Sequence, residues 1–280
     1  MEKDKERLKI LKKIEEYEIN GTFDIDVEDD PPTIPIKPGE VDYLRKKVSS
    51  KVKASIANKA ASKFFKKLKK ENKVIIKEIN GLENLYLLKD TGFIITCNHF
   101  NPLDTFTVEY VFNNYKYNKK QKLYKVIREG NYTNFPGFYG FLMKNCNTLP
   151  LSENKHVLKE FLDSTKVLLE KKQAILIFPE QSMWWNYRKP KPLKTGAFNI
   201  AYRNNVPILP IFITMEDTSI IGDDGFNIQA YTVNINPPIY PDENLSKKEN
   251  INNMLNKNFE ISKKVYEEFY KTKLKYKTKR

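Results

Sequence analysis

A histidine and an aspartate five residues apart are the part of this sequence best suited to chemistry. His99 and Asp104 enclose Pro102 and follow a short apolar run, residues 93–97, that favours a buried strand. Because proline fixes its own φ and suits the first turn of a helix, Asp104 is expected in that turn, with its carboxylate directed toward the imidazole. A carboxylate on one ring nitrogen fixes the tautomer and leaves the other nitrogen free as a base. The spacing therefore predicts a dyad that removes a proton from a hydroxyl group.

The same residues also allow a purely structural interpretation. Asp104 could cap a helix, and His99 could be a buried histidine with its hydrogen bonds satisfied. Cys97 is a weaker candidate for a nucleophile, because neighbouring residues of a strand point to opposite faces. These few residues do not decide between the alternatives, so other parts of the chain must.

A second polar cluster follows another apolar run, residues 174–178. Glu180, Gln181 and Ser182 come directly after it, and a group of cations and a glycine comes next: Arg188, Lys189, Lys191, Lys194 and Gly196. In open α/β sheets, ligands bind where parallel strands end, so both clusters are expected to share one crevice. A glutamate, a hydroxyl and several cations there suit an acceptor that carries hydroxyls and a phosphate. An ordinary solvated loop is the alternative interpretation of the cations.

The alternation of apolar strands and amphipathic helices predicts the fold class. Strands are expected at 73–79, 93–97, 122–127, 174–178, 208–214 and 230–235, and helices at about 104–115, 155–171, 195–203 and 246–272. Strands separated by helices imply an α/β fold with a mixed, mostly parallel sheet flanked by helices. We assign this domain to residues 71–280.

Two further segments precede that domain. Residues 1–40 are expected to form a short amphipathic helix and then an acidic, proline-rich segment that is either an extended linker or an arm lying on the domain. Residues 41–70 are expected to form one long helix with an apolar face at Val41, Leu44, Val48, Val52, Ile56, Ala60, Phe64 and Leu68. Its other faces carry eleven lysines and arginines.

A basic amphipathic helix can dock on an anionic membrane, each basic group adding on the order of 1 kcal/mol of attraction. A helix packed on the domain with a solvated lysine face is the alternative, whereas a nucleic-acid surface is disfavoured because interleaved aromatics are lacking.

The composition excludes several classes of protein. The chain has 280 residues and a formal net charge of +14, with no apolar run of the roughly eighteen residues that a membrane-spanning helix needs. Its first residues contain no apolar signal region. The two cysteines, Cys97 and Cys146, have no zinc-type or disulfide spacing, so we expect a reduced, cytoplasmic compartment and no metal site.

Four motifs in order resemble the glycerolipid acyltransferase superfamily across residues 73–240. They are His99-x-x-x-x-Asp104, Phe178-Pro179-Glu180, Lys194-x-Gly196-Ala197-Phe198 and Val206-Pro207-Ile208-Leu209-Pro210. The resemblance implies that His99 is a general base, oriented by Asp104, and that it deprotonates an acceptor lipid. The alkoxide would attack the thioester of acyl-CoA or acyl carrier protein, a co-substrate, and no cofactor is implied.

The function expected from this resemblance is acyl transfer to a lysophospholipid, with 1-acyl-glycerol-3-phosphate as the first candidate acceptor and phosphatidic acid as the product. The candidate substrate-binding residues are Asn98, Arg128, Glu180, Gln181, Ser182, Arg188, Lys194 and Gly196. The alternatives are a related acyltransferase with glycerol 3-phosphate or another lysolipid as acceptor, a non-catalytic lipid-binding relative, and a hydrolase of thioesters. The expected location is peripheral, on the inner face of the cell membrane.

The sequence departs from the family pattern at the residues that usually bind phosphate. The family reads Phe-Pro-Glu-Gly-Thr-Arg in the second block, whereas this chain has Gln181, Ser182 and Met183. A further block that usually ends in arginine ends here in Glu153. Either Arg128, Arg188 and Lys194 substitute for these arginines, or the acceptor is not a plain lysophosphatidic acid. Aromatic residues flank these blocks and are expected in an acyl groove, at the bilayer interface or in the core: Phe135, Phe138, Tyr139, Phe141, Trp184, Trp185 and Tyr187.

Overall fold

A single seven-stranded sheet organises the chain in the computed structural model, which describes residues 3–29 and 33–278. The strand order is β1-β7-β6-β2-β5-β3-β4, and all neighbours are parallel except β6 and β7. The strands are β1 (Ile75–Asn80), β2 (Phe93–Cys97), β3 (Leu123–Arg128), β4 (Thr148–Leu151), β5 (Ala174–Ile177), β6 (Ile208–Ile221) and β7 (Asn227–Ile235). The predicted mixed, mostly parallel α/β sheet is confirmed, and β4 is the strand that the sequence analysis did not predict.

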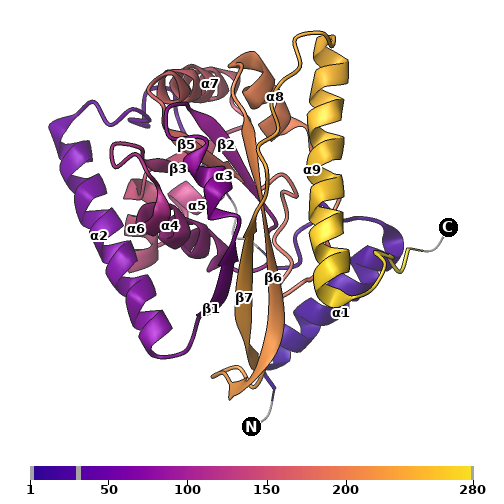
Figure 1. The fold of residues 1–280 in the computed structure, drawn as a ribbon. Helices are drawn as coiled ribbons and strands as arrows, with labels where there is room; N and C mark the ends of the chain where they lie inside the picture. Colours follow the sequence, from indigo (N-terminus) through magenta and orange to yellow (C-terminus); the bar gives the residue numbers. More distant parts are fainter. Residues whose placement is uncertain (1–2, 30–32, 279–280) are drawn as a thin grey trace.

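Helices cover both faces of this sheet, with α2 and α4 on one side and α9 on the other (Figure 1). They are α1 (Lys5–Asn20), α2 (Val48–Lys70), α3 (Leu82–Tyr86), α4 (Asp104–Tyr115), α5 (Glu129–Thr133), α6 (Gly137–Asn145), α7 (Lys155–Glu170), α8 (Gly196–Arg203) and α9 (Lys247–Tyr270). None of these helices of the described chain is long and apolar enough to cross a membrane.

The central strand β2 shows why the apolar runs become buried strands. All five of its residues are buried, and it pairs with β5 on one side and β6 on the other. Phe93 and Ile95 pack toward α3 and α4, whereas Ile94 packs toward α7, α8 and α9. Gly92 precedes the strand, and a Cβ there would lie 2.2 Å from the carbonyl oxygen of Leu169. Strand β2 is buried on both faces, and the residue before it packs closely against Leu169. These contacts fix the position of the carboxyl end of β2.

The helix predicted for residues 41–70 is shorter than expected, and its most buried stripe lies beside the predicted apolar face. It begins at Val48, because Asp42 accepts hydrogen bonds from the backbone of Lys46 and Lys47 and holds the preceding residues in a turn. Its buried residues are Ala54, Ala57, Ala61 and Phe65. The predicted apolar face was therefore wrong for Val48, Val52 and Ile56, which are 75%, 52% and 54% exposed. Alanines are buried because their small side chains let α2 approach α6, where Ala57 and Ala61 share a cluster with Leu142.

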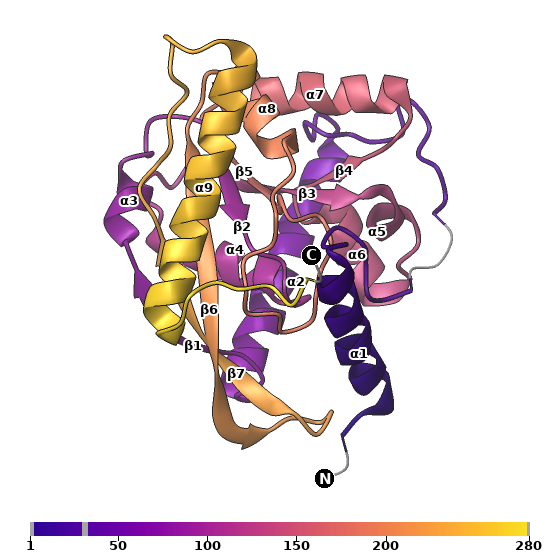
Figure 2. The same ribbon diagram turned by 90° about the vertical axis from the view of Figure 1, so that its right-hand side faces the viewer.

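Residues 3–29 and 33–40 pack on the rest of the chain. Ile36 joins the core beside α7, and Phe23 and Val27 form a separate cluster with Ile14 of α1 and Trp184. Residues 271–278 run from α9 to the end of α1, as Figure 2 shows, and their contacts there include the backbone N–H of Lys277 donating to Glu18 of α1 at 2.8 Å. Two of the predicted linker prolines, at positions 31 and 32, lie outside the described residues. We call residues 22–29 the acidic strap, because they carry four carboxylates over the loop that follows β5.

Candidate active site

His99 and Asp104 are in contact at the carboxyl end of β2. Asp104 opens α4 and is fully buried, and its Oδ2 lies 2.7 Å from Nδ1 of His99. The same oxygen accepts the backbone N–H of Phe100 at 3.1 Å, and Oδ1 accepts that of Thr105 at 2.5 Å. The carboxylate thus contacts the imidazole ring and also accepts backbone N–H groups of the turn that leads into α4.

The imidazole ring lies between the two strand ends and is partly open to solvent. It stacks on Phe178, with ring centroids 4.2 Å apart, and its side chain is 22% exposed. With Nδ1 engaged by Asp104, the neutral ring carries its proton there and Nε2 is the acceptor. Within the described ranges no protein group hydrogen-bonds to Nε2. This arrangement leaves one basic nitrogen able to receive a proton from a molecule outside the protein.

Glu180 is a buried carboxylate that hydrogen-bonds to the backbone of His99. Its side chain is buried, Oε2 accepts the backbone N–H of His99 at 3.1 Å, and Oε1 accepts that of Lys191 at 3.0 Å. Burial raises the pKa of Glu180, while the ammonium of Lys191 and the two amides lower it. Because both oxygens are occupied by the protein, the predicted substrate contact of Glu180 does not fit the structure.

Ser182 and Gln181, the next two residues, have different surroundings. The Ser182 hydroxyl is buried, donates to the carbonyl of Phe23 at 2.7 Å and accepts from Lys191 Nζ at 2.8 Å. It too was predicted to bind substrate and is instead a partner of the acidic strap. Gln181 is exposed and has φ of +66°. A left-handed backbone favours glycine, the residue that the family pattern described above has at this position.

Each of the three candidate phosphate-binding cations has a carboxylate partner. Lys194 Nζ lies 2.6 Å from Asp24, and Arg128 pairs with Asp26, so the acidic strap holds both. Arg188 is held further away by Asp217 of β6, at 2.9 Å. These side chains are between 38% and 46% exposed, so each pair remains in contact with solvent.

The two remaining predicted site residues, Asn98 and Gly196, have different surroundings. Asn98 is buried and exchanges two hydrogen bonds with the backbone of Ile213, which ties β2 to β6. Gly196 is the first residue of α8 and has open space where a Cβ would lie. The thiol of Cys97 is buried and its pKa is well above the ordinary value because of that burial, so the thiol is not a nucleophile in this structure.

The flanking aromatic residues divide into two groups. Trp184 and Trp185 are buried, which fits core packing. Phe135, Phe138 and Tyr139, around the start of α6, are 42%, 46% and 50% exposed. Hydrophobic residues exposed together in this way remain available for an apolar partner.

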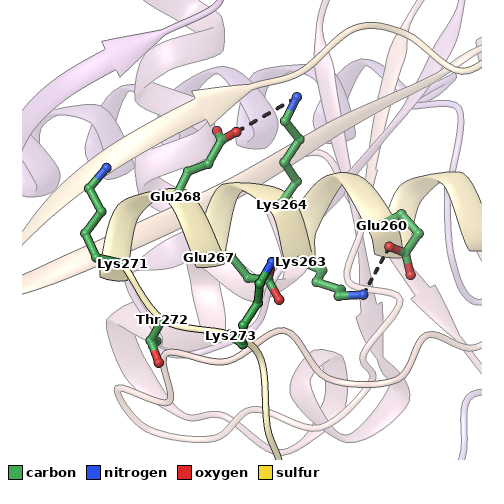
Figure 3. Close-up of a pocket in the computed structure, with 8 residues that line it drawn as sticks. All are labelled: Glu260, Lys263, Lys264, Glu267, Glu268, Lys271, Thr272 and Lys273. Carbon is green, nitrogen blue, oxygen red and sulfur yellow. Dashed lines mark hydrogen bonds and ion pairs between the residues drawn. The ribbon is translucent and has the colours of Figure 1, made fainter.

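Two open hollows lie beside α9, and neither is lined by His99 or Asp104. One has a volume of about 470 Å³ and is lined by charged residues near the end of the helix (Figure 3). Its Lys263 and Lys264 pair with glutamates at 3.4 and 3.9 Å. The other, of about 810 Å³, lies between α9 and residues 237–244. The described residues also contain no group of three or more histidine, cysteine or acidic side chains that could hold a metal ion.

The sequence analysis missed the importance of Lys191. This lysine is completely buried, and its ammonium lies 3.7 Å from Glu180 and 4.9 Å from the centre of the Trp184 ring. Burial lowers the pKa of Lys191 to about 8, although the neighbouring carboxylates, Glu180 first, act to raise it. The sequence offered no signal for this position, because Lys191 is one of several lysines in a polar stretch.

The central part of the chain matches known acyltransferases. Residues 77–214 match the family described as Acyltransferase. A chloroplastic 1-acyl-sn-glycerol-3-phosphate acyltransferase from Brassica napus is 29% identical over 168 residues, which are 58% of this chain and 45% of that protein. A 1-acyl-sn-glycerol-3-phosphate acyltransferase from Saccharomyces cerevisiae is 28% identical over 176 residues, 61% of this chain and 53% of that protein. The chain therefore spans about half the length of the curated relatives it matches.

A solved structure supports the fold over a larger part of the chain. The crystal structure of the 1-acyl-sn-glycerophosphate (LPA) acyltransferase PlsC from Thermotoga maritima superimposes with a TM-score of 0.55 and 20% sequence identity. The match covers 83% of this chain and 87% of the other. The sheet and its flanking helices are thus shared beyond the residues that carry the family motifs.

Proposed function

Because the chain belongs to the glycerolipid acyltransferase superfamily, we propose that it transfers a fatty acyl group from an acyl thioester to the hydroxyl of a lysophospholipid. The proposed acceptor is 1-acyl-glycerol-3-phosphate, which gives phosphatidic acid. The observation that carries this proposal is the contact of His99 with a buried carboxylate while its second ring nitrogen has no partner in the described protein. This is the arrangement that a general base for an alcohol requires.

The proposed reaction uses His99 twice. Nε2 takes the proton from the acceptor hydroxyl as the oxygen attacks the thioester carbonyl carbon, and Asp104 stabilises the imidazolium that forms. The C–S bond then breaks, and the departing thiolate of coenzyme A or acyl carrier protein takes the proton back. General-base help of this kind is worth roughly 10²- to 10⁴-fold in rate. His99 and Asp104 return to their starting state and the acyl donor is consumed as a co-substrate, so the proposed reaction needs no cofactor.

The proposed contacts for the acceptor phosphate are Lys194 and Arg128. The backbone N–H of Lys194 donates to Pro179 at 2.8 Å, which places this lysine directly beside the loop that supports His99. A phosphate would exchange with the Asp24 and Asp26 carboxylates that now hold the two cations. Glycerol 3-phosphate or another lysolipid is the second candidate acceptor, because Met183 and Glu153 stand where the family has arginines.

Replacing the proposed base tests the proposal. In purified His99→Ala, acceptor-dependent release of thiol from acyl-CoA should fall by about 10²-fold or more. His156→Ala is the matched control, because the chain's other histidine is exposed at the start of α7 and should leave the rate unchanged. Undiminished acceptor-dependent release by His99→Ala would contradict the mechanism.

A panel of acceptors with one acyl donor, followed by mass spectrometry of the lipids formed, tests the substrate. Formation of phosphatidic acid supports the first acceptor, and a product from another lysolipid or from glycerol 3-phosphate selects the second. Thiol release that ignores added acceptor would instead identify a hydrolase. Failure of every thioester, from coenzyme A and from acyl carrier protein, would favour a non-catalytic lipid-binding protein.

The proposed location is the inner face of the cell membrane, with α2 as the docking element. Its exposed Val48, Val52 and Ile56 lie among lysines, and Phe64 of α2 contacts the rings of Phe138 and Tyr139 of α6. This side of the molecule therefore combines apolar and cationic groups, as an anionic bilayer surface requires. The test is flotation with vesicles of varying anionic lipid content. Binding should rise with that content and fall with salt, and equal binding to neutral vesicles would remove the electrostatic part of the proposal.

A further inference from the structure

Lys191 is a buried lysine whose contacts lead directly to the proposed base. It lies in the loop between β5 and α8 and is fully buried. Its ammonium donates to the carbonyl oxygen of Ser182 at 2.5 Å and to the Ser182 hydroxyl at 2.8 Å. Burying an ammonium group is costly unless it is paired and hydrogen-bonded. The chain surrounds this cation with a carboxylate, two oxygens and the ring of Trp184.

The path from Lys191 to His99 consists of one side chain. Oε2 of Glu180 lies 3.7 Å from the ammonium and accepts the backbone N–H of His99. Oε1 of Glu180 accepts the backbone N–H of Lys191 itself. A charged carboxylate accepts such bonds more strongly than a neutral carboxyl group, and a nearby cation favours the charged form. The charge of Lys191 therefore bears on the position of the His99 backbone.

The His99 backbone in turn decides whether the ring meets Asp104. The amide held by Glu180 belongs to the same residue whose Nδ1 lies 2.7 Å from Asp104. On the other side, Trp184 donates its backbone N–H to the carbonyl of His99 at 3.2 Å. The loop after β5 thus holds both peptide groups of the histidine, and Lys191 is the cation at its centre.

We propose that Lys191 is a positioning residue for acyl transfer: its ammonium keeps Glu180 charged, and Glu180 holds the backbone of His99 where the ring meets Asp104. The inference rests on the proposed function for its effect on turnover. The inference also predicts a change in the position of the His99 ring, and this position can be observed without turnover.

The charge of Lys191 should give the rate a pH dependence of its own. The groups facing its ammonium are Glu180 in the same loop, Asp26 of the acidic strap and Asp104 of α4. Burial outweighs these carboxylates and lowers the pKa of Lys191 to about 8. As the pH rises through this value, the ammonium of Lys191 loses its proton. Glu180 then has no cation beside it to oppose the rise in its pKa that burial causes. The proposal therefore predicts a fall in rate as the pH rises past about 8.

The test compares Lys191→Met with Lys191→Arg. The methionine variant removes the charge at similar length, and kcat should fall by up to about 10²-fold with little change in KM, because small displacements of a catalytic group have effects of that size. The arginine variant keeps its charge at high pH. It should recover most of kcat, and the alkaline fall in rate should move to higher pH. Lys189→Met is the matched control, since Lys189 lies in the same loop but pairs with Glu18 of α1.

The histidine ring provides the second readout. His99 and His156 are the chain's two histidines, so their ring signals in NMR spectra can be told apart with His156→Ala. The chemical shift of the His99 ring signal should change in Lys191→Met and stay near the original in Lys189→Met. Unchanged kcat, pH profile and His99 signal in Lys191→Met would overturn the inference.

The remaining outcomes are also decisive. If Lys191→Met does not fold, an alkaline fall in Lys191→Arg that stays at its original pH would overturn the inference. If the unaltered protein turns over no thioester but its His99 signal responds to Lys191→Met, the proposed function fails while the positioning role holds.

Discussion

The two loops that form the candidate site, after β2 and after β5, are stabilised in different ways. In the loop after β2, Asp104 contacts His99, Phe100 and Thr105, all within five residues of it. In the loop after β5, Ser182 and Trp184 donate hydrogen bonds to Phe23 and Ile25 of the acidic strap, 159 residues earlier. The contacts of Asp104 are therefore local to the first loop, whereas the second loop depends on the N-terminal part of the chain.

This difference separates the effects expected from substitutions. Changes within the loop after β2 should act on the chemistry, because the contacts there concern the ring. Changes where the loop after β5 meets the acidic strap should act mainly on stability, because a hydrophobic cluster and long-range hydrogen bonds lie there. Three predictions test this separation.

The largest expected effect is that of Asp104→Asn on turnover. An amide has the size of the carboxylate but cannot stabilise an imidazolium, so kcat should fall by about 10²- to 10⁴-fold. The free energy of unfolding should change far less, since the amide oxygen can still accept a backbone hydrogen bond. Enzyme kinetics and urea denaturation measure the two quantities. Asp163→Asn on the exposed face of α7 is the control, and a rate loss explained by unfolding would break the comparison.

Phe23→Ala should have the largest effect on stability. The ring is buried, stacks on Trp184 at 5.6 Å and meets Tyr276 at 4.8 Å, so its removal should cost about 3 to 5 kcal/mol of unfolding free energy. Denaturant unfolding measures this change. Ile25→Ala is the control, because the Ile25 side chain is exposed while its backbone makes the bond to Trp184, and it should cost under about 0.5 kcal/mol. Equal costs for the two variants would show that the acidic strap does not stabilise the loop through its cluster.

The smallest expected effect belongs to Gln181→Gly at the tip of the loop after β5. Its φ of +66° is unfavourable for a residue with a Cβ, so glycine should raise the unfolding free energy by up to about 1 kcal/mol. Thermal unfolding should then shift upward by on the order of 1 to 3 °C. Gln181→Ala keeps the Cβ and should bring no gain. A lower melting temperature for the glycine variant would mean that local backbone strain is unimportant here.

The parts of the fold and site that were predictable depend on nearby residues. Apolar runs such as 93–97 and 174–178 predict buried strands, and the five-residue spacing of His99 and Asp104 predicts their contact. The expected substrate contacts of Glu180, Ser182 and Asn98 did not fit, because each side chain is buried against a distant segment. A polar residue after a strand has the same local pattern whether it faces a substrate or another part of the protein.

The sequence by itself determined the strands, the α/β class and the dyad, because these follow from periodicity and from contacts a few residues long. Only the tertiary structure decided which face of α2 is buried, which carboxylates hold Arg128, Arg188 and Lys194, and that the Lys191 side chain is buried beneath the loop after β5. The physical reason is that burial and charge pairing depend on which distant segments meet. Lys191 differs from the other lysines only in the folded chain, where it is buried beside Glu180.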